Sequence, residues 1–489
     1  PARLRAVIRA GVAASGASPL RLRLVLIILA LGGVALLFVS PVNRLPPPAL
    51  FLPFALLWPW LTAALLVHLG DPAAHRSTRF FNRLVGSWTG LVILALLLEA
   101  GLRLLLPVLP RAWLYPLPAS LLGLTPAQRI ARDLGAEANR VYDYPFDPAA
   151  SGDLFATTCL PAPEADPADA LTIRYTRDEF GFRNTSPWPS DVTVAVSGDS
   201  FVDGFHVNDP FWWGVDPGVI ALSESGFGTF EEAIVLREYG LPATPDVVVL
   251  VFFGGNDLED NWRFSVVNGP EFLGTYTPGG HLLSLNLGYW FLRQATYRQE
   301  TADESGDCAY PVQDSLGTPL AFLAGYVAPL AVPADVMQAS GAWAVTREAV
   351  LSASADAQAA GARLMIAYIP PKAQVHWPLL LASGQAVRAA QYVAPVVAAL
   401  PGGLAVPASS PQDVADLITA NLGTQAALLA ELATEAGTDF LDFTPSFQDA
   451  AAAGEVLYYY GDTHWNQAGH DLARGVLRDF LAENDLLAE

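Results

Sequence analysis

The stretch that most constrains the fold is Asp191–Phe205, in which a short apolar run stops abruptly at small and polar residues. The β-branched run Val192–Val196 predicts a strand that is buried on both faces, as in a parallel sheet. The run ends in the turn Ser197–Ser200, so the strand would deliver Ser200 to the carboxyl edge of the sheet. Open α/β sheets place their chemistry at that edge. Taken alone, Gly-Asp-Ser is also ordinary turn composition.

Apolar runs of strand length recur along the chain, with stretches of helical pattern between them. The further strand candidates are Leu171–Thr176, Gly218–Leu222, Val247–Phe253, Arg363–Ile369 and Thr438–Phe443. The helix candidates are Pro126–Glu137, Phe230–Tyr239, Trp343–Ala360, Thr424–Ala436 and Ala468–Glu483. Strands that alternate with helices predict an α/β fold, here a three-layer α/β/α sandwich with a mostly parallel sheet. The stretch 261–340 shows no clear periodicity and is interpreted as an insertion.

The first 111 residues differ in composition from the rest. They contain eleven Arg and only two acidic residues, a net charge of +9, so the remainder of a chain with a net charge of −21 carries −30. Apolar runs at about 22–42, 49–69 and 84–109 are predicted to be transmembrane helices. A secretory signal is the alternative for the first run, but three runs in succession favour membrane helices.

The distribution of arginine predicts how this segment is oriented. Arg residues gather before the first run and between the second and third, which places the N-terminus in the cytoplasm. The predicted organisation is a multi-pass anchor in the cytoplasmic membrane over 1–111, a connector over 112–170 and an extracytoplasmic domain over 171–489. The anchor would contact the lipid bilayer and could bind membrane protein partners through its helices.

Charge and cysteine content exclude several classes of function. The acidity of the chain argues against nucleic-acid binding, because phosphates would be repelled. No zinc-type cysteine spacing is present, and neither a metal nor a cofactor is expected. Cys159 and Cys308 could form a disulfide outside the cytoplasm, or remain two buried thiols that never meet.

Polar residues that follow the predicted strands form a set with a chemical meaning. Ser200, Gly226 and Asn256 each follow a strand, and a later turn supplies Asp462 and His464. Acyl transfer needs a hydroxyl nucleophile, an imidazole base, a carboxylate that orients it and donors for the oxyanion. Ser200, His464 and Asp462 can fill the first three roles. The backbone N–H groups of Ser200 and Gly226 and the side-chain amide of Asn256 can form the oxyanion hole.

These blocks resemble those of the SGNH (GDSL) hydrolases. Gly198-Asp199-Ser200 resembles the first block, Gly226 the oxyanion glycine, Gly254–Asp257 the GGND block and Asp462–His464 the last block. The resemblance covers roughly residues 171–480. It implies a flavodoxin-like fold and a serine nucleophile at Ser200.

The last block differs from the usual form of the family in the spacing of its aspartate and histidine. Many members of the family have two residues between the aspartate and the histidine, whereas only Thr463 stands here, and Trp465-Asn466 follow. This form is similar to the SGNH-like proteins of alginate and exopolysaccharide O-acetylation. The segment Asp178–Arg183 (DEFGFR) resembles the one preceding the serine in membrane-anchored bacterial members. The resemblance implies O-acetyl transfer to, or removal from, an envelope polysaccharide.

The favoured function is an extracytoplasmic serine esterase or O-acyltransferase acting on acyl esters of envelope glycans. The alternative is a non-catalytic accessory subunit of a membrane complex that keeps the fold. Several residues have simpler interpretations than catalysis. These are His206, which is assigned no role, His470 as a surface or packing residue, His376 and His281 as exposed loop residues rather than the lining of a substrate groove, Asp203 and Asp257 as turn or capping residues, and Tyr458–Tyr460 with Trp212-Trp213 as core rather than sugar-stacking surfaces.

Overall fold

The computed structural model describes residues 101, 126–146, 171–184, 186–208, 217–268 and 309–486. The expected transmembrane runs lie outside these residues, apart from Gly101, and so do Cys159 and Cys308. No helix in the described ranges is long and apolar enough to cross a membrane. The described residues from 126 onward belong to one compact unit, and the expected domain boundaries stay a prediction.

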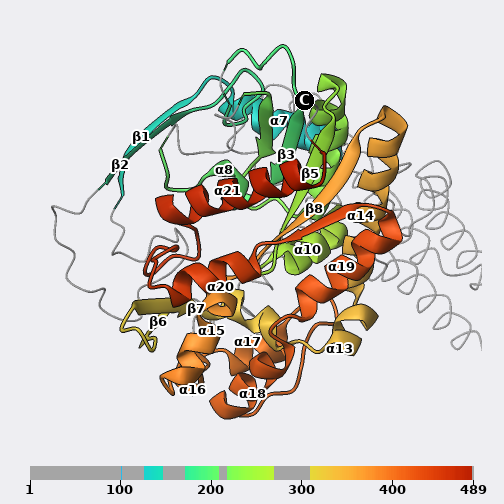
Figure 1. Cartoon of the computed structure of the whole chain (residues 1–489). Coiled ribbons are helices and arrows are strands. Elements are labelled where there is room, and N and C mark those ends of the chain that lie inside the picture. The colour runs from blue at the N-terminus through green and yellow to red at the C-terminus, as the bar shows by residue number, and fades with distance from the viewer. Residues whose placement is uncertain are drawn as a thin grey trace, which may run out of the picture. The chain divides into compact units, whose positions relative to one another are not determined.

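Five parallel strands form the central sheet (Figure 1). They are β3 Val194–Gly198, β4 Val219–Ser223, β5 Val247–Phe253, β8 Arg363–Ile369 and β9 Asp439–Asp442. Their spatial order is β4-β3-β5-β8-β9, and every neighbouring pair is parallel. In chain order this is 2-1-3-4-5, the order of flavodoxin-like doubly wound sheets. The α/β class and the parallel sheet expected from the sequence are confirmed.

Strands β3, β4, β5 and β8 are mostly apolar because both faces of the sheet are covered there, whereas the edge strand β9 (DFLD) is only partly buried. All seven residues of β5 are buried. Val247, Val249 and Val251 belong to one hydrophobic core, and the alternate residues Val248 and Leu250 belong to the other. A strand that packs on both sides cannot show the polar alternation of a half-exposed strand, which is why the sequence shows continuous apolar runs.

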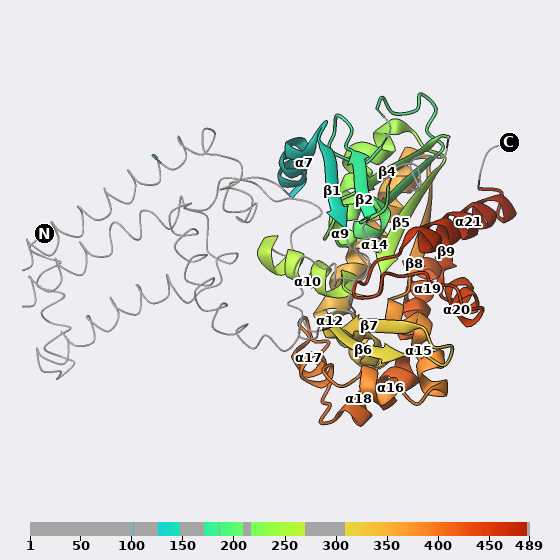
Figure 2. The ribbon, with the colours of Figure 1, turned by 90° about the vertical axis from the view of Figure 1, so that its left-hand side faces the viewer.

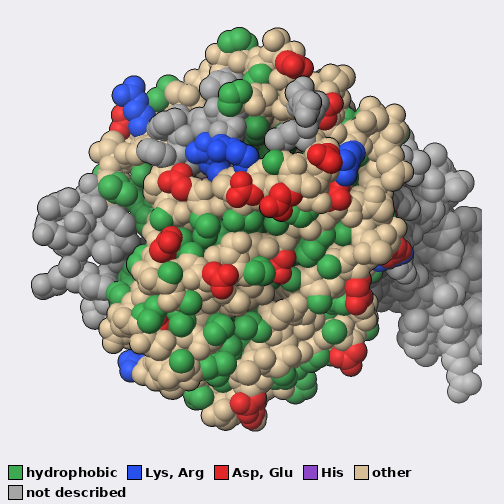
Figure 3. All heavy atoms as spheres, in the orientation of Figure 1, with side chains coloured by type: hydrophobic (Ala, Val, Ile, Leu, Met, Phe, Trp, Pro, Cys, Tyr) green, Lys and Arg blue, Asp and Glu red, His purple; other side chains and the backbone are tan. Residues whose placement is uncertain are grey.

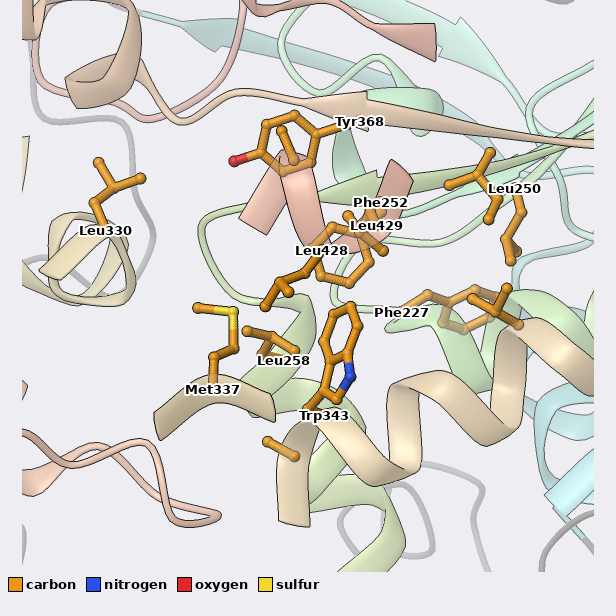
Figure 4. Close-up of a cluster of buried hydrophobic side chains, with 14 of the residues drawn as sticks. Phe227, Leu250, Phe252, Leu258, Leu330, Met337, Trp343, Tyr368, Leu428 and Leu429 are labelled. Carbon is orange, nitrogen blue, oxygen red and sulfur yellow. The ribbon is translucent and has the colours of Figure 1, made fainter. Parts of the chain in front are cut away.

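Helices cover both faces of the sheet, as Figures 1 and 2 show. The larger core contains residues of α9 Thr229–Val235, α14 Gly341–Ala360 and α19 Thr424–Ala436. The opposite core contains residues of α8 Ser200–Asp203, α20 Thr444–Ala452 and α21 Gln467–Glu483. In Figure 4, Trp343 of α14 and Leu428 of α19 pack with Phe252 of β5 in the larger core.

The remaining elements lie before and between the strands of the sheet. Ahead of β3 are α7 Pro126–Glu137 and the antiparallel pair β1 Val141–Phe146 and β2 Leu171–Thr176. Between β4 and β5, a π-helical turn Leu236–Gly240 and a 3₁₀ turn Leu241–Ala243 follow α9. Between β5 and β8 are α10 Asp257–Asn268, the antiparallel pair β6 Ala309–Gln313 and β7 Pro319–Leu323, α12 Ala324–Val327, a 3₁₀ turn Ala328–Ala331 and α13 Ala334–Ala339. Between β8 and β9 are α15 Lys372–Ala382, α16 Ala386–Ala389, α17 Ala394–Ala399 and α18 Pro411–Asn421.

Acidic side chains are spread over the face of the molecule drawn in Figure 3, and basic ones are few there. This agrees with the net charge of −30 that the sequence assigns to the residues after 111.

Candidate active site

The turn after β3 presents Ser200 at the carboxyl edge of the sheet. Gly198 ends the strand, and a Cβ atom at this position would lie 2.3 Å from Cγ2 of Val202, so a larger residue would push the turn apart. Asp199 caps α8, because its side chain accepts a hydrogen bond from the N–H of Phe201 at 2.9 Å. Ser200 is then the first residue of α8, and its side chain remains partly accessible.

Ser200, His464 and Asp462 form a continuous hydrogen-bonded row. Nε2 of His464 lies 2.7 Å from Oγ of Ser200, and Nδ1 of His464 lies 2.5 Å from Oδ1 of Asp462. A carboxylate can only accept, so Nδ1 carries the proton and Nε2 is free to accept the proton of the serine. The sequence placed these three residues together, and the structure brings them into contact. Their catalytic roles remain a prediction.

The single residue between Asp462 and His464 is explained by a local turn. Oδ1 of Asp462 accepts the backbone N–H of His464 at 2.7 Å, as well as the proton on its imidazole. A side chain that binds the N–H two residues ahead forms an Asx turn. This turn folds the carboxylate back onto the following imidazole, so the shorter spacing still gives the contact that the resemblance leads one to expect.

Asp462 remains ionised in this setting. Its side chain has no exposed surface. Burial alone would raise its pKa, but the charge and the hydrogen bonds of His464 outweigh burial and hold the pKa well below its usual range. A permanently charged carboxylate against Nδ1 stabilises the imidazolium that forms when His464 takes a proton.

Lys372 fastens the loop that carries Asp462 and His464, and the sequence interpretation missed it. Its ammonium donates to the carbonyl oxygens of Tyr459, Tyr460 and Asp462 at 3.0, 2.9 and 2.5 Å. All three protons are therefore used within the loop. Burial lowers the pKa of Lys372 to about 7, while the charge of Asp462 opposes that shift. A signal was available, because Lys372 is the single lysine of the chain and stands just after β8.

The expected oxyanion donors follow the strands on either side of β3. Gly226 follows β4 with φ of 83°, in a turn closed by the N–H of Phe227 on the carbonyl of Glu224 at 3.1 Å. A side chain there would be strained by the backbone conformation alone. Among the described residues, the backbone N–H groups of Ser200 and Gly226 have no hydrogen-bond partner.

Asn256 follows β5 and is held by a carboxylate. Its amide nitrogen donates to Oδ2 of Asp260 at 2.6 Å, which leaves its second N–H available. Because β3 lies between β4 and β5, the turn of Ser200 stands between the turns of Gly226 and Asn256. Their role as oxyanion donors stays a prediction.

The other residues considered in the sequence have varied outcomes. His470 is buried on α21 edge-on to Trp465, as expected of a packing residue, and burial lowers its pKa to about 3. The loop interpretation of His376 is wrong, because the ring is buried on α15, 3.4 Å from Asp314. Pro370, Pro371 and Pro378 favour a loop in the sequence, but the first two precede α15 and the third lies inside it.

Aromatic and acidic residues near the site are structural. Tyr458 and Tyr459 are buried, as expected, whereas Tyr460 is only partly buried. Asp203 forms a buried ion pair with Arg177 at 3.1 Å, and Asp257 accepts the N–H of Phe253 at 2.9 Å. His281 and Trp212-Trp213 lie outside the described residues. Within the described ranges, no group of three His, Cys, Asp or Glu residues could hold a metal ion.

Among known proteins, similarity was found only to solved structures. No protein-family model and no curated protein sequence matches the chain. It is similar to a protein assigned as an acylhydrolase from Bacteroides fragilis NCTC 9343, at 13% identity and a TM-score of 0.29, over 61% of this chain and 92% of that one. It is also similar to a GDSL-like lipase from Bacteroides thetaiotaomicron VPI-5482, at 12% identity and a TM-score of 0.27, over 60% and 88%. The proposal below rests on the geometry of the site.

Proposed function

We propose that this protein is a serine esterase or O-acyltransferase of the SGNH type. The observation that carries the proposal is the hydrogen-bonded row from Ser200 through His464 to Asp462. The row lies at the carboxyl edge of a doubly wound parallel sheet, where such folds place their active sites. A serine that only stabilised a turn would not need an imidazole nitrogen 2.7 Å from its hydroxyl oxygen.

The geometry supports a two-step reaction. Oγ of Ser200 attacks the carbonyl carbon of an acyl ester while Nε2 of His464 takes its proton, and Asp462 stabilises the resulting imidazolium. The tetrahedral oxyanion would be bound by the N–H groups of Ser200 and Gly226 and by the amide of Asn256. Collapse expels the alcohol, which receives the proton from His464. Water or a sugar hydroxyl then attacks the acyl-serine and reverses these proton transfers.

We further propose that the acyl group is acetyl and that the acceptor or substrate is an envelope polysaccharide outside the cytoplasmic membrane. Support comes from the sequence alone. It consists of the apolar, arginine-rich residues 1–111, the acidic remainder, and the similarity of Asp462–Asn466 to the exopolysaccharide O-acetylation proteins. Whether water or a sugar hydroxyl accepts the acyl group depends on what covers the site.

A fluorophosphonate probe tests the serine chemistry directly. The probe phosphonylates only a serine that a neighbouring base activates. The full chain should be labelled at Ser200, and labelling should vanish in Ser200→Ala. Asp471→Asn is a matched surface control, because its side chain lies 53% exposed on α21. Equal labelling of wild type and Ser200→Ala would overturn the proposal and favour a non-catalytic accessory role.

A further inference from the structure

The buried carboxylate of Asp462 uses only one of its oxygens for the contacts described above. Oδ1 accepts two hydrogen bonds from His464, whereas Oδ2 has no hydrogen-bond partner among the described residues. A buried carboxylate oxygen without a donor is unfavourable, because the water it has lost is not replaced. Nε2 of His206 lies 3.7 Å from this oxygen, just beyond hydrogen-bond length.

His206 is held in an unusual conformation that aims its ring at the site. Its φ is 61°, in the left-handed region that residues other than glycine rarely adopt. The ring is stacked on Phe146 with centroids 3.9 Å apart, and the hydroxyl of Tyr459 donates to the His206 carbonyl at 2.7 Å. Strained residues persist where the surrounding contacts fix them, and they gather at functional sites.

Arg183 of the DEFGFR segment fixes the turn that leads from Ser200 to His206. Its guanidinium is buried and donates to the carbonyl oxygens of Asp203, Gly204 and Val207 at 3.0, 2.7 and 2.7 Å. Three bonds from one rigid fork constrain the chain on both sides of His206. The DEFGFR segment, which has no part in the proposed reaction, therefore holds the ring of His206 in place through Arg183.

Tyr144 of β1 contacts the ring of His206 on the side away from Asp462. Its hydroxyl lies 3.2 Å from Nδ1 of His206. Burial raises the pKa of Tyr144 to about 12, so the hydroxyl keeps its proton and can donate it to Nδ1. With Nδ1 accepting from Tyr144, the proton of a neutral ring is on Nε2, which faces Oδ2 of Asp462. The opposite tautomer would set a lone pair against the carboxylate.

We propose that His206 is a positioning residue for the acid–base pair, with its Nε2–H holding Oδ2 of Asp462 while Oδ1 serves His464. The carboxylate is shared between two imidazoles and cannot rotate away from the base. The inference rests on the proposed serine chemistry. The 3.7 Å separation is slightly longer than a hydrogen bond, as contacts in an active site often are before substrate binds. In this proposal the proton moves between Ser200 and His464, and His206 only positions the carboxylate.

Two substitutions at His206 separate the donor from the packing of the ring. His206→Phe keeps an aromatic ring against Phe146 but has no donor, whereas His206→Gln keeps an N–H near the position of Nε2. With p-nitrophenyl acetate as substrate of the full chain, we expect His206→Phe to lower kcat by about tenfold with KM unchanged, since a bond to a charged group is lost. His206→Gln should stay within about threefold of wild type.

The controls make failure of the inference distinct from failure of the proposed function. If Ser200→Ala hydrolyses the ester as fast as wild type, the serine chemistry is wrong and the inference falls with it. If Ser200→Ala is inactive but His206→Phe retains wild-type kcat, or if Gln and Phe lose activity equally, the inference alone is overturned. Should His206→Phe fail to fold in a thermal melt, Tyr144→Phe replaces it. Its kcat should fall about threefold with KM unchanged, and wild-type kcat there would overturn the inference.

Discussion

Replacing Asp462 by asparagine tests the charge on which the proposed mechanism depends. Asparagine has the shape of aspartate and can still accept the N–H of His464, so the Asx turn survives. Asparagine has no charge to stabilise the imidazolium. Its amide N–H can also face Nδ1, in which case the proton of the imidazole moves to Nε2 and the base can no longer accept from Ser200. The wild-type contact joins Nδ1 to Oδ1 at 2.5 Å in a side chain with no exposed surface.

The size of the effect follows from this contact. Charge centres roughly 4 Å apart attract by about 4 kcal/mol at an effective dielectric constant of about 20. That energy corresponds to about a 10³-fold loss in kcat. The tautomer error increases the loss, so we expect kcat for p-nitrophenyl acetate to fall by about 10³–10⁴-fold. Asp471→Asn should retain wild-type kcat. A loss below tenfold for Asp462→Asn, in protein that melts like wild type, would refute the role of the carboxylate.

Three further changes probe the surroundings of the row. Asn256→Ala should lower kcat about 10²–10³-fold with little change in KM if the amide binds the oxyanion, and an unchanged kcat would remove Asn256 from that role. Lys372→Met leaves three loop carbonyls without their donor and should lower the free energy of unfolding by roughly 2–4 kcal/mol in urea. A free energy of unfolding equal to that of wild type would mean that these three hydrogen bonds do not stabilise the fold. Glu232 is fully buried, and burial raises its pKa well above the usual value. The free energy of unfolding that this carboxyl contributes is therefore fully present below pH about 4.3, the pKa of an unfolded glutamate. It is lost as the pH rises toward the pKa in the folded state, at about 1.4 kcal/mol per pH unit. Glu232→Gln should therefore raise the melting temperature more at pH 8 than at pH 5, and an equal effect at both would show that the carboxyl does not titrate in this way.

The sequence predicts best those strands and helices that have a continuous apolar run or a clear helical pattern. The continuous apolar runs Val247–Phe253 and Arg363–Ile369 have the predicted bounds, as do the helices Pro126–Glu137 and Thr424–Ala436. The strand before Ser200 begins at Val194 rather than Val192, because the parallel ladder with β4 starts there. Composition marks an apolar run, whereas pairing partners decide where a strand begins.

The stretches that the sequence predicts poorly contain short elements buried from several sides. The region 261–340 gives α10, β6, β7, α12 and α13 where no period was visible, and the Ala- and Pro-rich stretch after β8 gives four short helices. The short helices α12, α13, α15, α16 and α17 lack side-chain N-caps, and only α18 has one, from Ser410. Their positions depend on tertiary contacts that are distant in sequence.

The site also contains residues that the sequence predicts and residues that only the fold reveals. Ser200, Asp462 and His464 carry motif signals, and the structure brings them together. Lys372 and His206 carry no motif, because their contacts with the catalytic loop join residues far apart in the chain. Lys372 reaches Asp462 across ninety positions, and the turn that places His206 depends on Arg183, from a segment that precedes β3. Only the folded arrangement shows that a second imidazole faces the carboxylate.

The central claim is that Ser200 becomes acylated during turnover. The most direct measurement is to mix the full chain with p-nitrophenyl acetate, stop the reaction with acid within one turnover, and locate the acetyl group by peptide mass spectrometry. We expect an acetyl group on Ser200 in wild type and none in Ser200→Ala. Rapid hydrolysis with no acetyl group on Ser200, or with the acetyl group on another residue, would contradict it.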